Sequence, residues 1–152
     1  MELTIPMIKI DDQSVYNVKI ETGTIIGTGT QRRVYNLKSH VEYVLKEELE
    51  DKKQHKNLVE WHIYEKHSDL HGWLARPIAK TKDHKYMLME KGAPLKDKSR
   101  IPENIPPGFG DIEKPENWVE LPSGSIVMCD YSHDIFVKNY TEGKSMFLRK
   151  KL

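Results

Sequence analysis

The chain has 152 residues, 38% of them hydrophobic and 31% charged, a composition that suits one globular domain or two small lobes. Its 24 basic and 23 acidic residues give a formal charge of +1, which argues against a dedicated nucleic-acid-binding protein. The single cysteine, Cys129, suits a reducing compartment, and neither a signal peptide nor a membrane span is recognisable. We therefore expect a cytoplasmic protein without a membrane partner.

The first third of the chain has the pattern of an antiparallel β-sheet. Short runs rich in Ile, Val, Tyr and Thr alternate with polar residues and are separated by Asp, Gly and Asn. These runs are LTIPMIKI, SVYNVKI, GTIIGTG, RRVYNL and EYVLKEE.

The next segment predicts one helix. Residues 48–67 contain neither Gly nor Pro, and Leu58, Trp61 and Tyr64 recur along them as an apolar stripe. Farther along, residues 73–92 have the pattern of two strands joined by a Lys-Asp-His turn. A proline-rich connector follows, and residues 118–132 predict a hairpin that turns at Pro-Ser-Gly.

The stretch IIGTGTQRRVY, residues 25–35, allows two interpretations. Its glycines can form an ordinary hairpin tip, since glycines are common in turns. They can also form a lid over the phosphates of a nucleotide, because glycine lets the backbone approach an anion closely. The lid residues would be Gly27, Thr28, Gly29 and Thr30. In the pattern G-x-G-x-x-G-x-V, the valine falls on Val34, but Arg32 replaces the third glycine.

Two charged residues downstream match further requirements of phosphoryl transfer. Lys46 follows apolar residues in a predicted strand and could contact the α- and β-phosphates. Glu60 lies beside the apolar stripe of the predicted helix and is the expected partner of Lys46, with Glu65 as the alternative. The competing interpretation of each is a solvated surface charge, which is the commoner case.

Candidates for a base and for metal ligands come last in the chain. Asp111 and Asn117 stand in FGDIEKPENW, where a proline-containing loop could bring them together. Asp130 follows the apolar run 126–128, at whose end an acidic side chain can face a cleft. Asp and Asn oxygens are hard ligands of the kind that Mg²⁺ prefers.

Taken in order, these segments resemble the protein-kinase-like superfamily, which includes the aminoglycoside phosphotransferases. IIGTGTQRRVY resembles the glycine-rich loop, VLK the strand that carries the lysine, and NLVEWHIYEKH the helix with its paired glutamate. KYMLMEKGAPL resembles the fifth strand and hinge. FGDIEKPENWVELPSGSIVMCDYS resembles the catalytic loop, its hairpin and the metal-binding D-F-G. The resemblance covers roughly residues 20–135.

The resemblance implies an α+β, kinase-like fold: a twisted antiparallel N-terminal sheet with one helix, and a minimal C-terminal part. The division would fall between residues 1–95 and 96–152. The implied cofactors are ATP and Mg²⁺, with the adenine near Met89. The implied site residues are Asp111, Lys46 and Glu60 for catalysis, Gly27, Thr28, Gly29, Thr30, Val34, Lys46, Met89, Glu90 and Gly92 for nucleotide binding, and Asn117 and Asp130 for Mg²⁺.

Two functions stay open at this point. One is Mg²⁺-dependent transfer of the γ-phosphoryl group of ATP to a hydroxyl of a protein or small molecule. The other is a pseudokinase or interaction module, which binds a protein partner without transfer; the short chain after Asp130 favours this function. So short a chain is compatible with a phage or mobile-element origin, in which case the compartment would be the host cytoplasm.

Two other signals are weak. His67 and His71 have a spacing that a helix could use for zinc, but further ligands are not evident in the sequence. The segment TEGKS ends like a P-loop, but Lys138 stands where the first glycine of that motif should be.

Overall fold

The computed structural model describes the chain except for residues 1, 30, 50–54, 107–108, 110–111 and 133–152. The chain forms two compact units, which are described separately. The first contains Met1–Ser68 and Arg76–Lys91, and the second contains Asp69–Ala75 and Gly92–Leu152.

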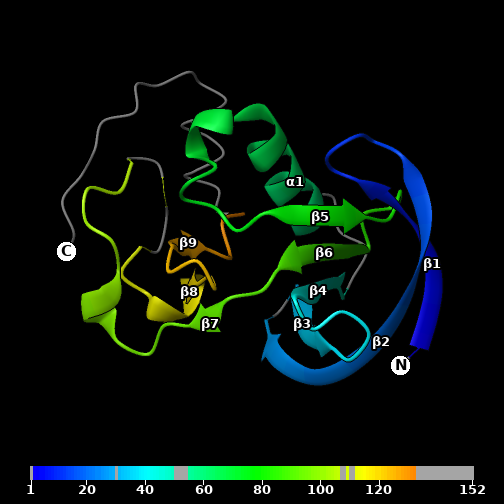
Figure 1. Ribbon diagram of the computed structural model, residues 1–152, viewed down its shortest axis with the longest axis horizontal. Coiled ribbons are helices and arrows are strands. Elements are labelled where there is room, and N and C mark those ends of the chain that lie inside the picture. Colours follow the sequence, from blue (N-terminus) through cyan, green and yellow to red (C-terminus); the bar gives the residue numbers. More distant parts are fainter. Residues whose placement is uncertain (1, 30, 50–54, 107–108, 110–111, 133–152) are drawn as a thin grey trace. The chain divides into compact units, whose positions relative to one another are not determined.

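The first unit is built on a closed, six-stranded antiparallel barrel (Figure 1). The strands follow the order β1-β2-β3-β4-β6-β5, and β5 pairs with β1 to close the ring. Closure removes the free edges that an open sheet would present. The bounds are Glu2–Lys9 for β1, Val15–Thr28 for β2, Arg32–Leu37 for β3, Tyr43–Glu48 for β4, Pro77–Lys80 for β5 and Tyr86–Glu90 for β6.

The core of this unit lies inside the barrel. Every strand contributes at least one buried apolar side chain to it: Met7, Val18, Ile20, Leu37, Leu45, Ala79 and Leu88. Because successive side chains of a strand point to opposite faces, the burial of Leu45 in this core places Lys46 on the outer face of β4. The same alternation places Arg32 and Val34 of β3 on the outer face.

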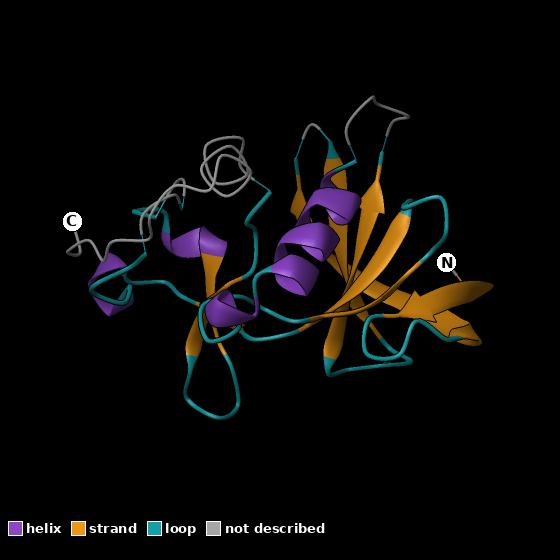
Figure 2. Ribbon diagram, turned by 90° about the horizontal axis from the view of Figure 1, so that it is seen from above, coloured by secondary structure: helices purple, strands orange, loops and turns teal. Residues whose placement is uncertain are grey.

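Helix α1, Lys56–Lys66, packs on the outer face of the barrel against β4 and β5 (Figure 2). It begins at Lys56, later than the start near residue 48 that the sequence predicts. Its buried residues recur at the spacing of one helix face: Asn57, Glu60, Trp61, Ile63 and Tyr64. Two of these five residues are polar and Leu58 is only partly buried, so the predicted apolar stripe is only partly correct.

The second unit contains a three-stranded antiparallel sheet in the order β7-β8-β9. The strands are Ala93–Pro94 for β7, Trp118–Glu120 for β8 and Ile126–Met128 for β9. Strands β8 and β9 confirm the hairpin predicted for this segment. Gly124 in its turn has a φ of +92°, a conformation that glycine adopts without a steric cost.

Aromatic side chains fill the interior of the second unit. Trp118 and Tyr131 are fully buried, and Phe109 meets Trp73 edge to face at 6.3 Å between ring centroids. The Tyr131 hydroxyl donates a hydrogen bond of 2.9 Å to the carbonyl oxygen of Ala75, and the indole N–H of Trp118 donates one to a backbone carbonyl. Both polar groups are therefore satisfied inside the core. Short 3-10 turns at Lys98–Arg100 and Pro115–Asn117 complete the unit.

The predicted fold class, α+β and kinase-like, is wrong. The protein is mostly β, with one α-helix and two antiparallel sheets among its described residues, and these residues show no kinase-like C-terminal lobe. The first strand closes the sheet into a barrel through the pairing of Ile8 with Lys80, which the sequence pattern does not reveal. After Gly92, prolines remove backbone donors, and short strands and turns stand where that class has helices.

Candidate functional site

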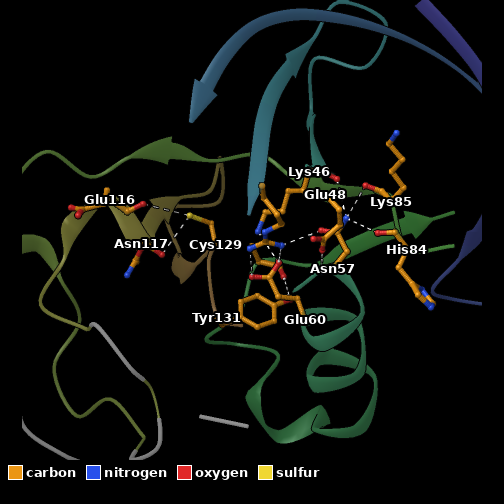
Figure 3. Close-up of polar contacts among 12 residues, drawn as sticks. Lys46, Glu48, Asn57, Glu60, His84, Lys85, Glu116, Asn117, Cys129 and Tyr131 are labelled. Carbon is orange, nitrogen blue, oxygen red and sulfur yellow. Dashed lines mark hydrogen bonds and ion pairs between the residues drawn. The ribbon is translucent and has the colours of Figure 1, made fainter. Parts of the chain in front are cut away.

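The best-defined group of buried charges lies on the outer face of the barrel, where α1 packs on β4 (Figure 3). Lys46 Nζ is 2.9 Å from Oε1 of Glu60, and both residues are buried. The predicted pairing of these two residues is therefore present, and Glu60 is the partner. The alternative, Glu65, is exposed and accepts a hydrogen bond from Gln13 instead.

Arg32 is a second cation on the same carboxylate. Its Nη1 donates to Oε1 of Glu60 at 2.7 Å, and its Nη2 donates to Oε2 at 3.0 Å. This two-pronged geometry is the strong form of an arginine–carboxylate contact. Sequence reasoning missed Arg32 because it stands where the glycine-rich pattern has its third glycine. Its neighbour across the strands, Glu48, is defined by the register of β3 and β4, which is known only once the chain is folded.

The two cations control the charge of Glu60. Burial alone would raise the pKa of the carboxyl, because the charged form loses its hydration. The positive charge of Arg32 lowers the pKa, and so does that of Lys46. The hydrogen bonds that both side chains donate to the carboxylate lower it further, and these effects together outweigh burial. The pKa of Glu60 is therefore held well below its ordinary value, and the side chain is a carboxylate at neutral pH.

Asn57 anchors this cluster to the barrel. Its Oδ1 accepts a hydrogen bond from Arg32, while its Nδ2 donates to the carbonyl oxygens of Lys46 and His84 at 3.0 and 2.9 Å (Figure 3). Asn57 is fully buried, so these bonds replace the water that its amide would otherwise need. It lies one helix turn before Glu60, and this spacing is the sequence signal that would have found it.

Several predicted nucleotide-binding residues share the face that carries Lys46. Val34 lies opposite both Gly27 and Lys46 in the strand registers, and residues directly opposite one another project to the same face. Val44, two residues before Lys46, lies opposite Met89. The structure therefore brings Gly27, Val34, Lys46 and Met89 to one side of the sheet.

The glycine stretch forms the connection between β2 and β3. Gly27 and Thr28 end β2, and the backbone N–H of Gly29 donates a hydrogen bond of 2.9 Å to the carbonyl oxygen of Arg32. Thr30 lies outside the described residues. A Cβ built on Gly27 or Gly29 would meet its nearest atom at 3.9 or 3.8 Å, an ordinary contact, and neither residue has a positive φ. The fold therefore does not require glycine at either position.

The predicted hinge residues have packing partners of their own. Oε1 of Glu90 accepts a hydrogen bond of 2.8 Å from the backbone N–H of Arg76 in the first unit. In the second unit, a Cβ on Gly92 would come within 2.7 Å of Val119 Cβ and 2.9 Å of the carbonyl oxygen of Glu120. Close approach to β8 thus explains Gly92 without a ligand.

The two predicted metal ligands, Asn117 and Asp130, lie at neighbouring positions of the backbone beside the β8–β9 hairpin. The carbonyl oxygen of Asn117 accepts a hydrogen bond of 2.8 Å from the backbone N–H of Cys129, the residue before Asp130. Asp111, the predicted base, lies outside the described residues. Among the residues described, no group of three or more His, Cys, Asp or Glu side chains could hold a metal ion. The Mg²⁺ roles of Asn117 and Asp130 stay predictions.

Comparison with known proteins gives no family for this chain. No protein-family model matches it, and no curated protein matches its sequence. Within the described part of the chain, no helix has both the length and the apolar character to cross a membrane.

Proposed function

We propose that this protein binds a nucleoside triphosphate with Mg²⁺ and that Lys46 contacts the phosphates. The observation that carries the proposal is the buried pair of Lys46 and Glu60, in which a helix carboxylate orients a strand lysine. Such a lysine supplies the cation that nucleotide phosphates need.

The surroundings of Lys46 support the proposal. Neither packing nor backbone conformation requires glycine at positions 27 and 29. Close approach of a phosphate to the backbone would require it, because glycine has no side chain in the way. Val34 and Met89 share the face of Lys46 and offer the apolar contact that a nucleobase needs. Lys46 is buried in this structure, so phosphate binding requires that the atoms over its ammonium group move aside.

The enzymatic form of the proposal is transfer of the γ-phosphoryl group to a hydroxyl of a protein or small molecule. It needs an acceptor base and Mg²⁺ ligands, for which the sequence names Asp111, Asn117 and Asp130. Replacing the base would remove turnover while leaving nucleotide affinity nearly intact, because a general base acts in the transition state. Cytoplasmic location belongs to this proposal, since ATP and a reducing environment for Cys129 are both found there.

The second candidate is an interaction module that does not bind nucleotide. The observation in its favour is the complete burial of Glu60 under two cations, which also suits a clamp that fixes α1 to the barrel. In that case Lys46 would be a structural residue, and the function would lie on the surface.

Thermal unfolding with and without Mg²⁺-ATP separates the two candidates. Ligand at a hundred times its Kd stabilises the folded state by about 2.7 kcal/mol, which is a readily measured shift. We expect this shift in the wild type and in Lys80→Met, and its loss in Lys46→Met. Lys80 is a matched control because it is also a buried strand lysine next to α1, but it contacts the ring of Trp61. An equal response of all three proteins to nucleotide, or no response in the wild type, would contradict the proposal.

A further inference from the structure

The two cations on Glu60 are bound in different ways. Lys46 donates a hydrogen bond of 2.9 Å to Oε1. Arg32 occupies both carboxylate oxygens, at 2.7 and 3.0 Å, and also donates to Oδ1 of Asn57 at 3.1 Å. Oε1 is thus shared between the two cations, whereas Oε2 is contacted by Arg32.

The two side chains also differ in how firmly they are held. The guanidinium group is a rigid planar fork, and Arg32 is further fixed by Asn57, whose own amide is bound to backbone carbonyls of the barrel. The ammonium group of Lys46 sits on a flexible stem with rotatable donors. If one cation leaves Glu60, it is Lys46.

We propose that Arg32 is a positioning residue that keeps the Glu60 carboxylate in place and compensated when the ammonium group of Lys46 turns from Glu60 to an incoming phosphate. This inference rests on the proposed function, in which a nucleotide phosphate reaches Lys46. Its physical basis is the high cost of leaving a buried charge unpaired. With Arg32 in place, Glu60 keeps both of its oxygens bonded when Lys46 moves.

Acid unfolding tests the roles of the two cations without any nucleotide. Circular dichroism would follow the unfolding of the wild type, Arg32→Met, Lys46→Met and Arg33→Met as the pH falls. Arg33 is the matched control, because it is the next residue of β3 and contacts Tyr35. Arg32→Met should unfold at a higher pH than Lys46→Met, while Arg33→Met should unfold like the wild type.

A shift in Lys46→Met as large as that in Arg32→Met would overturn the inference. Failure of Arg32→Met alone to fold at neutral pH would support it, and failure of Lys46→Met alone would overturn it. If neither folds, glutamine at each position repeats the same comparison with a polar side chain retained.

Nucleotide titration then tests the release of Lys46. Arg32→Met should weaken Mg²⁺-ATP binding by about tenfold or more, because the buried carboxylate, having lost Arg32, holds Lys46 more strongly. Adenosine, which has no phosphate, should bind the variant and the wild type equally, and Arg33→Met should bind both ligands normally. Equal losses for ATP and adenosine would show a merely structural role and overturn the inference.

Absence of ATP binding in the wild type would overturn the proposed function and with it the release of Lys46. The comparison of acid unfolding would still decide whether Arg32 holds Glu60.

Discussion

The carboxylate of Glu48, the last residue of β4, accepts a hydrogen bond of 2.8 Å from the backbone N–H of Asn57, in the first turn of α1. The residue at the N-cap position, His55, makes no side-chain capping bond. A strand residue therefore supplies the cap that the helix sequence lacks, and it brings a negative charge to the positive end of the helix dipole.

Removal of this cap should destabilise the protein. We expect Glu48→Ala to lower the free energy of unfolding by about 1–2 kcal/mol, the usual range for loss of an N-terminal cap. Urea denaturation followed by tryptophan fluorescence measures the change. Glu42→Ala is the control, since Glu42 is exposed and should change stability by no more than about 0.5 kcal/mol. Equal effects of the two substitutions would show that Glu48 does not cap the helix.

Stability should also depend on pH through Glu60. Its pKa is lowered in the folded protein, so its contribution is fully present above the pKa of the unfolded chain, near 4.5, and is lost as the pH falls through the lower folded value. Glu60→Gln should therefore cost about 3–5 kcal/mol at neutral pH, because it removes the buried negative charge that both Arg32 and Lys46 contact. The difference from the wild type should shrink below about pH 4. A difference that stays constant down to pH 3 would mean that Glu60 does not titrate as described.

Gly92 and Gly72 make a matched pair for packing in the second unit. Gly92→Ala should cost about 1–3 kcal/mol, since its Cβ would overlap β8 and force a backbone shift. Gly72→Ala should be close to neutral, because no atom lies within 4 Å of a Cβ at that position. Denaturant unfolding of both variants checks the contrast, and a neutral Gly92→Ala would show that β8 is not held this closely.

The sequence predicted strands and turns better than their assembly. Alternation in LTIPMIKI and YVLKEE shows which residues share a face, but it does not say which strand pairs with which. The pairing of Ile8 with Lys80 joins distant parts of the chain and turns the sheet into a barrel. Local patterns carry no information about such a contact, and the resemblance in the order of the segments led to the wrong fold class.

The candidate site was predicted in part for a similar reason. The pairing of Lys46 with Glu60 followed from the order of motifs and the helix register. Asn57 was missed because apolar periodicity was used to find the buried face of α1, whereas two of the five buried residues of the helix are polar. Arg32 was missed because it lies in β3, at the position of a motif glycine. Buried polar residues such as Asn57 are recognised by their partners, and partners from other strands are known only once the chain is folded.

Gly27 offers a test of the lid interpretation. Gly27→Ala should leave stability within about 1 kcal/mol of the wild type, because its Cβ would make an ordinary contact of 3.9 Å with Val34. The methyl group would lie on the face of Lys46, so we expect weaker binding of Mg²⁺-ATP, by about tenfold. Calorimetric titration of the variant measures this. Normal affinity in a normally stable variant would leave the glycines as an ordinary hairpin turn.

Chemical labelling of the lysines tests the central claim most directly. An acyl-phosphate derivative of ATP, bound in the site, transfers its acyl group to a lysine amine beside the phosphates, forming an amide and releasing ATP. Peptide mass spectrometry of the labelled protein identifies the lysine. We expect the label on Lys46 and its loss when excess Mg²⁺-ATP is present, because ATP and the probe compete for the same site. Labelling of surface lysines alone, unaffected by Mg²⁺-ATP, would contradict the assignment of Lys46 to a nucleotide site.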